Sequence, residues 1–598
     1  MKNLFSIIRI GFGVICSVLL LSVLSSMGMK NIEAQYYYDG NEPQPTAIPF
    51  AVEKENDYLN ITMSFSLNQF HASRFVVGPD DCIEELFINN TEIVEAKGLC
   101  NMRPGFRITF PNLQSRNTVR MRIHDTGGTG GVSIHTSWLD PMLLSVLLMF
   151  ILILSWTAKE LLLACGKTKE TTLIPLLILV ALLLRIGLSH HGGFGGDMNL
   201  NRYWAYNATE LGLVQSYTQK IDPGIMLPNY PPLSMMIFSA VGHVHKSFFS
   251  HGKDLELPSF YIIKVPGILA DLFVIIALFL LILPMGGKRS AFMIATVYAF
   301  HPAILHNSSI WGQTDAIFTL FMCITILCIR RERWVLTGIA YAIALMLKMQ
   351  ALILFPIVFI AILPYLRRWL LVTLGGIAVA IPVFIPFANQ NALDIIYNIY
   401  SGSVGYYTNL SSNAYNLWVM LYTRDTGKAS TDAIFYLFTY RSFGILLWAA
   451  IIATVLNKWY FAIHDDIRSK GKNGMLLLSA AIIAYAFFVF NAEMHERYLF
   501  PYMVLGLPLL LIGRKGIVLY CCASLLFILN LSSIVSFGSF DSWLLQDELE
   551  NALPVIVSTL QVVTFFFTWS YINTYQKTLN YKDSLLRSFM RAMRRSST

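Results

Sequence analysis

Long apolar runs separated by short polar segments dominate the pattern of the chain. Runs such as 475–490 are almost pure hydrocarbon, and an apolar helix of about 20 residues is what crosses a lipid bilayer. The pattern predicts a polytopic α-helical membrane protein with about 14 transmembrane helices. Their expected positions are 9–28, 141–164, 172–189, 259–283, 290–306, 315–330, 335–348, 351–366, 369–387, 440–457, 475–490, 498–512, 516–537 and 553–574.

A second pattern fills residues 35–138. The stretches 59–67, 107–110 and 119–123 alternate apolar and polar side chains between Gly- and Pro-containing breaks, which is typical of strands with one buried face. We expect a small β-sandwich outside the membrane. Cys82 and Cys100 are its only cysteines, and an oxidising compartment favours a disulfide between them.

Composition agrees with the membrane class. Hydrophobic residues make up 55% of the 598 positions and charged residues 13%, which is more apolar surface than a soluble chain could bury. The net charge of +8 is scattered over short loops. It therefore indicates membrane topology and not a nucleic-acid partner.

Basic clusters fix the predicted orientation. They fall on one side of the membrane, together with the N-terminus, if the apolar stretch 231–244 does not cross the bilayer. This stretch begins with two prolines and contains His243, and His245 follows directly after it. We therefore interpret it as an interfacial helix, and the basic side as cytoplasmic. The expected parts are 1–34 (anchor or signal peptide), 35–138 (β-sandwich), 139–171 (second spanning helix and cytoplasmic loop), 172–512 (catalytic membrane core), 513–576 (C-terminal spanning helices) and 577–598 (basic cytoplasmic tail).

Polar clusters gather on the opposite, non-cytoplasmic side of this scheme. Three ionisable groups, His495, Glu496 and Arg497, stand where two apolar runs meet. Ionisable groups are costly there and by default mark a ligand site, and a fork-shaped cation suits a phosphate. A helix cap is the alternative role for His495. Lys348, at another outer helix end, either binds the same phosphate or only extends toward water.

Asp197 is the candidate general base. It follows a glycine cluster just beyond an apolar run, and a carboxylate can take the proton of an acceptor hydroxyl. The alternative is a solvated loop aspartate. Gln313 and Asp315 either bind sugar hydroxyls or cap a helix. The outer loops of the bundle contain no Asp-X-Asp sequence, so we expect no metal, and no nucleotide or other cofactor motif is found.

The order of these residues resembles the GT-C superfamily of integral-membrane glycosyltransferases. The resemblance covers about residues 172–512 and is nearest to the family related to the second mannosyltransferase of GPI-anchor synthesis; dolichyl-phosphate-glucose glucosyltransferases are more distantly similar. It rests on Asp197, Tyr230-Pro-Pro232, Lys264, Asp271, Trp311 to Asp315, Lys348 to Gln350, Pro356, Asn413 to Trp418 and Met494 to Pro501.

The resemblance implies an inverting transfer of a hexose, mannose rather than glucose, from a polyprenyl-phosphate donor on the non-cytoplasmic face. Asp197 would be catalytic, and His495, Arg497 and Lys348 would bind the donor phosphate. The acceptor would be a membrane lipid, a glycan or a protein. Substrate or sugar contacts would come from Tyr230, Trp311, Gln313, Asp315, Gln350, Asn413, Asn416 and Glu496.

A transporter or flippase of lipid-linked sugars is the contrasting class, because it too needs an anion site within a bundle. Transporters commonly contain internal repeats with sites at mid-membrane, and neither is evident here. Short loops favour a bacterial inner membrane over the endoplasmic reticulum.

Overall fold

The computed structural model describes residues 30–46, 50–53, 57–67, 73–79, 81–100, 106–125, 129–136, 169–220, 226–248, 257–387, 397, 399–400, 405, 407–422, 428–435, 437–535 and 547–596. It divides into two compact units, one formed by the chain up to Pro175 with Ser239–Ile262 and the other by Leu176–Phe238 with the chain from Ile263 onward. The spans expected at 9–28 and 141–164 lie outside the described residues.

Two antiparallel sheets form the N-terminal unit. The first has the strand order β2-β1-β4-β9-β6-β7 and the second β3-β10-β5-β8. The strands are β1 (Lys30–Tyr38), β2 (Gln44–Thr46), β3 (Phe50–Glu53), β4 (Asp57–Ser66), β5 (Arg74–Pro79), β6 (Cys82–Ile88), β7 (Thr91–Glu92), β8 (Phe106–Thr109), β9 (Arg116–Asp125) and β10 (Thr129–Thr136).

Alternation of side chains builds the core of this β unit. Leu59, Ile61, Met63 and Phe65 on β4 are buried, whereas the residues between them are partly exposed. Successive side chains of a strand point to opposite faces, so one face of each sheet supplies the core. The disulfide expected from the sequence is present and joins Cys82 to Cys100.

The second unit is helical. Its helices, with the shared helices α3, α5 and α6, are α3 (Lys169–Leu188), α4 (Gly195–Glu210), α5 (Pro232–Phe248), α6 (Leu257–Ala299), α7 (Pro302–Leu305), α8 (Asp315–Arg330), α9 (Trp334–Leu347), α10 (Phe355–Ile362), α11 (Leu366–Phe384), α13 (Leu417–Tyr422), α14 (Tyr440–Lys458), α15 (Tyr460–Arg468), α16 (Met475–Phe490), α17 (Phe500–Leu505), α18 (Arg514–Ser532) and α20 (Asp547–Ser596).

This unit makes the chain a helical membrane protein. Five of the described helices are long and apolar enough to cross a bilayer, and four shorter apolar helices accompany them. The five are Tyr261–Ala299, Leu366–Phe387, Tyr440–Lys458, Arg514–Ser532 and Ala552–Leu579.

Several predicted helices differ in their boundaries. The helices expected at 259–283 and 290–306 are the two halves of α6, separated by the non-helical Gly287, whose φ is 71°; the second half ends at Ala299. The predicted helix 351–366 is a 3₁₀ segment, η4 (Met349–Leu354), followed by the short α10. Residues 231–244 are helical, as part of α5.

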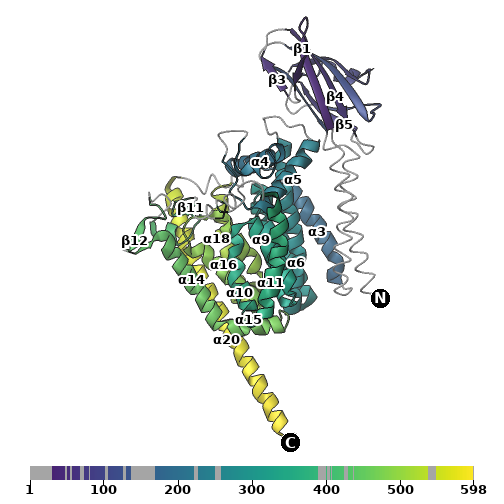
Figure 1. Cartoon of the computed structure of the whole chain (residues 1–598). Coiled ribbons are helices and arrows are strands. Elements are labelled where there is room, and N and C mark those ends of the chain that lie inside the picture. Colours follow the sequence, from purple (N-terminus) through teal and green to yellow (C-terminus); the bar gives the residue numbers. More distant parts are fainter. Residues whose placement is uncertain are drawn as a thin grey trace, which may run out of the picture. The chain divides into compact units, whose positions relative to one another are not determined.

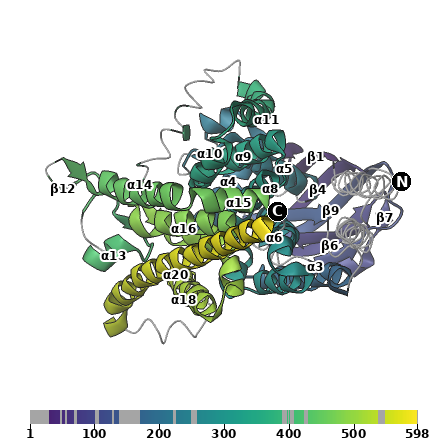
Figure 2. The same ribbon diagram turned by 90° about the horizontal axis from the view of Figure 1, so that it is seen from below.

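The helices run alongside one another (Figure 1), and α16 lies between α14 and α20 (Figure 2). Trp448 of α14 donates its indole N–H to the carbonyl of Ile483, at 3.1 Å. Tyr485 of α16 donates its hydroxyl to the carbonyl of Gln561 on α20, at 3.2 Å. A helix that is apolar all round is expected at such a buried position, and nearly all of α16 is buried.

Candidate active site

Lys264 joins the two loops that carry the central site residues. Its Nζ donates to the carbonyls of Ser189 and His191 in the loop before α4, at 3.2 and 2.6 Å. It also donates to the carbonyls of Ser309 and Ile310, at 3.0 and 2.8 Å, in η3 (His306–Trp311), a π-helical turn. The lysine is almost fully buried, so these charge-assisted bonds hold both loops at one place.

Three glycines permit the close approach of the same loops. A Cβ on Gly193 would lie 2.3 Å from the carbonyl oxygen of Trp311, and one on Gly312 would lie 2.7 Å from the sulfur of Met198. Gly193 and Gly312 also have positive φ angles of 71° and 90°, which glycine adopts without steric cost. Gly267 of α6 similarly leaves room for the carbonyl of Gln313.

A buried ion pair between α3 and α6 holds η3 in place. Arg185 of α3 donates from Nε to a carboxylate oxygen of Asp271 on α6, at 3.0 Å, and both side chains are fully buried. Tyr298 and Ser308 donate their hydroxyls to the same carboxylate. Because removing one partner would leave a buried charge unpaired, this network keeps η3 in one position.

Asp197 lies in the first turn of α4 and faces η3. One carboxylate oxygen, Oδ2, accepts from the amide of Gln313 at 2.6 Å and from the indole of Trp311 at 3.2 Å. The same oxygen lies 3.6 Å from Nη1 of Arg497, and 27% of the Asp197 side chain remains exposed. The predicted base therefore lies beside three other predicted site residues, Trp311, Gln313 and Arg497, and the carboxylate is reachable.

Arg497 is shared between two carboxylates. Its Nη1 also donates to Glu496 at 2.8 Å, whereas its buried Nε has no hydrogen-bond partner among the described residues. Burial raises the pKa of the Glu496 carboxyl. Although burial by itself would lower the pKa of Arg497, Asp197 and Glu496 hold it well above its usual range. Arg497 therefore carries a positive charge, and its buried Nε is available to a ligand.

Lys348 does not extend toward water. It is buried, and its Nζ pairs with Asp315 at 2.5 Å. Burial opposes its charge, but the neighbouring Asp315 and Tyr230 outweigh burial and raise its pKa. Asp315 also accepts from the amide of Asn307, at 3.2 Å.

Tyr498 connects the two cations. Its ring lies 5.7 Å from Nζ of Lys348 and 5.8 Å from the guanidinium carbon of Arg497. Tyr230 borders the same group, with Lys348 lying 5.6 Å from its ring. These contacts join Asp197, Arg497, Lys348 and Asp315 into one cluster with aromatic walls.

His495 stands at the edge of this cluster. It is half-buried, and its ring lies 4.9 Å from Tyr407 and 5.2 Å from Tyr498. Burial, followed by the charges of Arg497 and Lys348, holds the pKa of His495 well below its usual range. His495 is neutral at pH 7, so it can offer a donor and an acceptor but no charge to a phosphate.

Two asparagines have roles within the protein. Asn416 is fully buried; its amide donates to the carbonyls of Phe488 and Asn491, at 3.2 and 3.1 Å, and accepts from the backbone of Trp418. It therefore holds a turn at the end of α16. Its buried amide is used within the protein and is not exposed to a sugar. Asn413 has a φ of 67° and pairs through its backbone with His495.

Gln350 differs from Asn416, because its buried amide makes no hydrogen bond among the described residues. Its side chain is buried, yet neither the amide nitrogen nor the amide oxygen has a hydrogen-bond partner in the part of the chain that the structure describes. Unpaired buried polar groups are costly and rare. Gln350 follows Lys348 by two residues, so it remains a candidate for binding sugar hydroxyls.

Sequence reasoning gave no role to Lys264 or Tyr498. A lysine inside the apolar run 259–283 was the available signal for Lys264, because an intramembrane charge normally has a specific partner. Tyr498 directly follows Arg497 in the sequence. Its position between two cations depends on Lys348 at the end of α9, which the spacing of residues in the sequence does not reveal.

The charge of the cluster differs from the expected anion site. Two cations, Arg497 and Lys348, face three carboxylates, Asp197, Asp315 and Glu496. Both cations are thus already paired, and among the described residues the Nε of Arg497 is a buried nitrogen of this cluster without a hydrogen-bond partner. Among the described residues, no group of three or more His, Cys, Asp or Glu side chains could hold a metal ion.

Comparisons with known proteins add a local match. Residues 313–403 match the family model described as ALG3 protein, and this match supports a glycosyltransferase of the GT-C type. The matched segment begins at Gln313 and includes Asp315, Lys348 and Gln350. A comparison with curated protein sequences finds no match.

Solved structures show weak similarity. The apo oligosaccharyltransferase of Archaeoglobus fulgidus is 12% identical over 69% of this chain and 56% of its own, with a TM-score of 0.33. The same archaeon's AglB, in complex with an inhibitory peptide and a dolichol-phosphate, is 11% identical over 67% and 55%, with a TM-score of 0.29. Arabinosyltransferase EmbB from Mycobacterium smegmatis is 13% identical over 96% and 64%, with a TM-score of 0.29. The chain spans a little over half the length of the archaeal structures that it matches.

Proposed function

We propose that this chain is a membrane glycosyltransferase that transfers a hexose, with mannose favoured over glucose, from a polyprenyl-phosphate donor. The acceptor is a lipid, a glycan or a protein on the non-cytoplasmic face. The observation that carries the proposal is the reachable carboxylate of Asp197 beside Arg497, a buried cation with an unused donor. The family match over residues 313–403 supports the same class of enzyme.

The reaction needs one base and one anion site. An acceptor hydroxyl attacks the anomeric carbon while the bond between this carbon and the phosphate oxygen breaks. The leaving phosphate takes the bonding electron pair, and Asp197 takes the proton of the hydroxyl. Attack opposite to the leaving group inverts the anomeric configuration.

Arg497 links the two halves of this chemistry. Its Nη1 lies 3.6 Å from Asp197, longer than its 2.8 Å bond to Glu496. A donor phosphate that bonds Nε and Nη2, which share one edge of the guanidinium, would make a fork-shaped contact. The phosphate would then share the positive charge of Arg497 with Asp197, and a carboxylate beside a neutralised cation is a stronger base. Donor binding would therefore activate the base.

A transfer assay with the purified chain tests the proposal. The protein is supplied with polyprenyl-phosphate mannose or polyprenyl-phosphate glucose and with a mixture of membrane lipids and extracytoplasmic proteins. A new glycosidic product with one donor is the expected result. Absence of product with both donors, together with translocation of the sugar lipid in sealed vesicles, would favour the transporter.

A further inference from the structure

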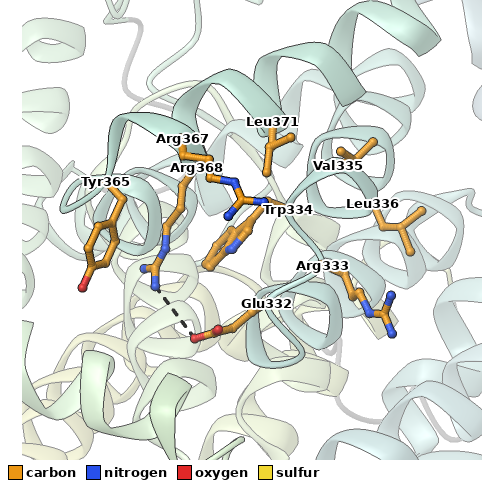
Figure 3. A pocket seen from close by; sticks show the side chains of 9 residues that line it. All are labelled: Glu332, Arg333, Trp334, Val335, Leu336, Tyr365, Arg367, Arg368 and Leu371. Carbon is orange, nitrogen blue, oxygen red and sulfur yellow. Dashed lines mark ion pairs between the residues drawn. The ribbon is translucent and has the colours of Figure 1, made fainter.

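A second polar site lies at the other end of α8 and α9. Asp315 begins α8 and Lys348 directly follows α9, whereas Arg330 ends α8 and Trp334 begins α9. At 1.5 Å per residue, the 16 residues of α8 span about 24 Å. A groove of about 610 Å³ opens at this far end, lined by Glu332, Arg333, Trp334, Val335, Leu336, Tyr365, Arg367, Arg368 and Leu371 (Figure 3).

One arginine of the groove is held in place. The guanidinium carbon of Arg368 lies 4.3 Å from the ring of Trp334 and 4.4 Å from the ring of Tyr365. Its Nη1 donates to the carbonyl of Ala361 at 2.8 Å, and its Nη2 lies 3.8 Å from Glu332. Because aromatic rings and a carbonyl fix its position, Arg368 forms a preorganised wall of the groove.

Two further arginines give the groove more positive charge than its one carboxylate, Glu332, can neutralise. Arg333 and Arg367 are exposed at the surface of the groove, and Figure 3 shows Arg367 and Arg368 extending from α11 toward Trp334. With Glu332 as the only carboxylate of the lining, three positive charges stand against one negative charge. The N-termini of α9 and α11 lie here as well, and their positive ends add to the attraction for an anion.

The helices that form the groove cannot easily separate. A Cβ on Gly338 would lie 1.9 Å from the carbonyl oxygen of Val372, and one on Gly375 would lie 2.1 Å from that of Val335. The backbones of α9 and α11 are therefore in direct contact one turn beyond the groove. This contact makes the groove a fixed feature of the bundle.

Exposed leucines continue from the groove along both helices. Leu336 lines the groove and is 49% exposed, and Leu366, Leu370 and Leu374 of α11 are at least as exposed. A soluble phosphate compound would gain nothing from such a surface, whereas acyl chains would cover it. We propose that this groove binds the phosphate head group of an anionic phospholipid, whose acyl chains lie along Leu336, Leu370 and Leu374.

Lipid binding to the full chain in a neutral detergent tests the proposal. Phosphatidylglycerol and phosphatidylcholine with identical acyl chains are titrated, and bound lipid is counted by native mass spectrometry. The double variant Arg333→Gln/Arg367→Gln should bind phosphatidylglycerol roughly 10–30-fold more weakly, from about fivefold for each arginine near an anionic lipid surface. Its binding of phosphatidylcholine should not change.

Arg514→Gln/Lys515→Gln is the matched control. It removes the same charge from an exposed pair at the start of α18, and it should weaken phosphatidylglycerol binding clearly less than the groove variant does. Thermal unfolding in phosphatidylcholine confirms that both variants are folded. If the double variant unfolds, Arg367→Gln alone should show about a fivefold loss.

Two results would overturn the proposal. Equal weakening by the control and the groove variant would mean general attraction between charges, without a site. Displacement of phosphatidylglycerol by an equal concentration of glycerol 3-phosphate would mean that the groove binds a soluble phosphate ester and that the leucines contribute nothing.

Discussion

Arg497 is the residue on which donor binding depends. It is buried, it pairs with Glu496 and approaches Asp197, and its Nε is unused. We expect Arg497→Ala to weaken donor binding by about 1.5–3 kcal/mol, because a hydrogen bond to a charged group contributes about that much. Titration of the donor into purified protein measures this change. Arg468→Ala, at an exposed position on α15, is the control, and unchanged donor affinity in Arg497→Ala would exclude the assigned role.

His495 makes a prediction about pH. Its pKa in the folded protein lies well below the usual value, which is about 6.5 in an unfolded chain. The unfolded state therefore binds more protons as the pH falls through about 6.5, and the stability contributed by neutral His495 is lost from there downward. That contribution is complete above about pH 7.

The matched variant is His495→Gln, which keeps a polar side chain but does not titrate. The difference in Tm between the wild type and this variant should be largest above about pH 7 and should shrink toward about pH 5. Thermal unfolding over this range measures the difference. A difference that stays constant with pH would show that His495 is not held neutral by the fold.

At the scale of elements, the two loops depend on their close approach. Gly193→Ala would place a methyl group against the carbonyl oxygen of Trp311, at 2.3 Å, where Gly193 also has a positive φ. We expect this variant to displace Asp197 from Trp311 and Gln313 and to lose at least about 10-fold in transfer activity, since small misplacements of a catalytic group are costly. The transfer assay measures the loss.

Gly192→Ala is the control for this variant, because a Cβ at Gly192 meets no heavy atom within 4 Å. It should retain most of the activity. If the two alanine variants lose activity equally, the glycine segment matters for its mobility and not for the approach of the loops.

Periodicity predicted the elements better than it predicted the contacts. Helices such as α8 and α16 begin and end within a residue of the expected ranges, because uninterrupted apolar runs leave little freedom in their boundaries. The break expected between 283 and 290 is present at Gly287, inside α6. The apolar pattern did not predict the 3₁₀ geometry of η4.

The candidate site was predicted as a set of residues but not as a set of partners. Asp197, Trp311, Gln313 and Arg497 were all named from the sequence, and the structure brings them together. The pairing of Lys348 with Asp315 was not foreseen, nor was the use of Asn416 within the protein. Such pairings depend on the crossing of distant helices, which residue spacing does not encode.

At the scale of the molecule, the account requires one orientation in the membrane. His190, in the loop before α4, and Arg289, just after the kink of α6, are both exposed. In a background without free cysteines, His190→Cys should react with a membrane-impermeant maleimide from outside intact cells. Arg289→Cys should react only after the membrane is opened. Equal accessibility of the two positions would contradict the predicted topology.

The central claim is that Asp197 accepts the proton of the acceptor hydroxyl. Asp197→Asn keeps the shape of the side chain and removes its basicity, so turnover should fall by about 10²–10⁴-fold while donor affinity changes little. Asp465→Asn, at a half-exposed carboxylate on α15, controls for the loss of a charge. Steady-state transfer and donor titration with the same three proteins provide both values. A turnover in Asp197→Asn equal to that of the wild type would contradict the account.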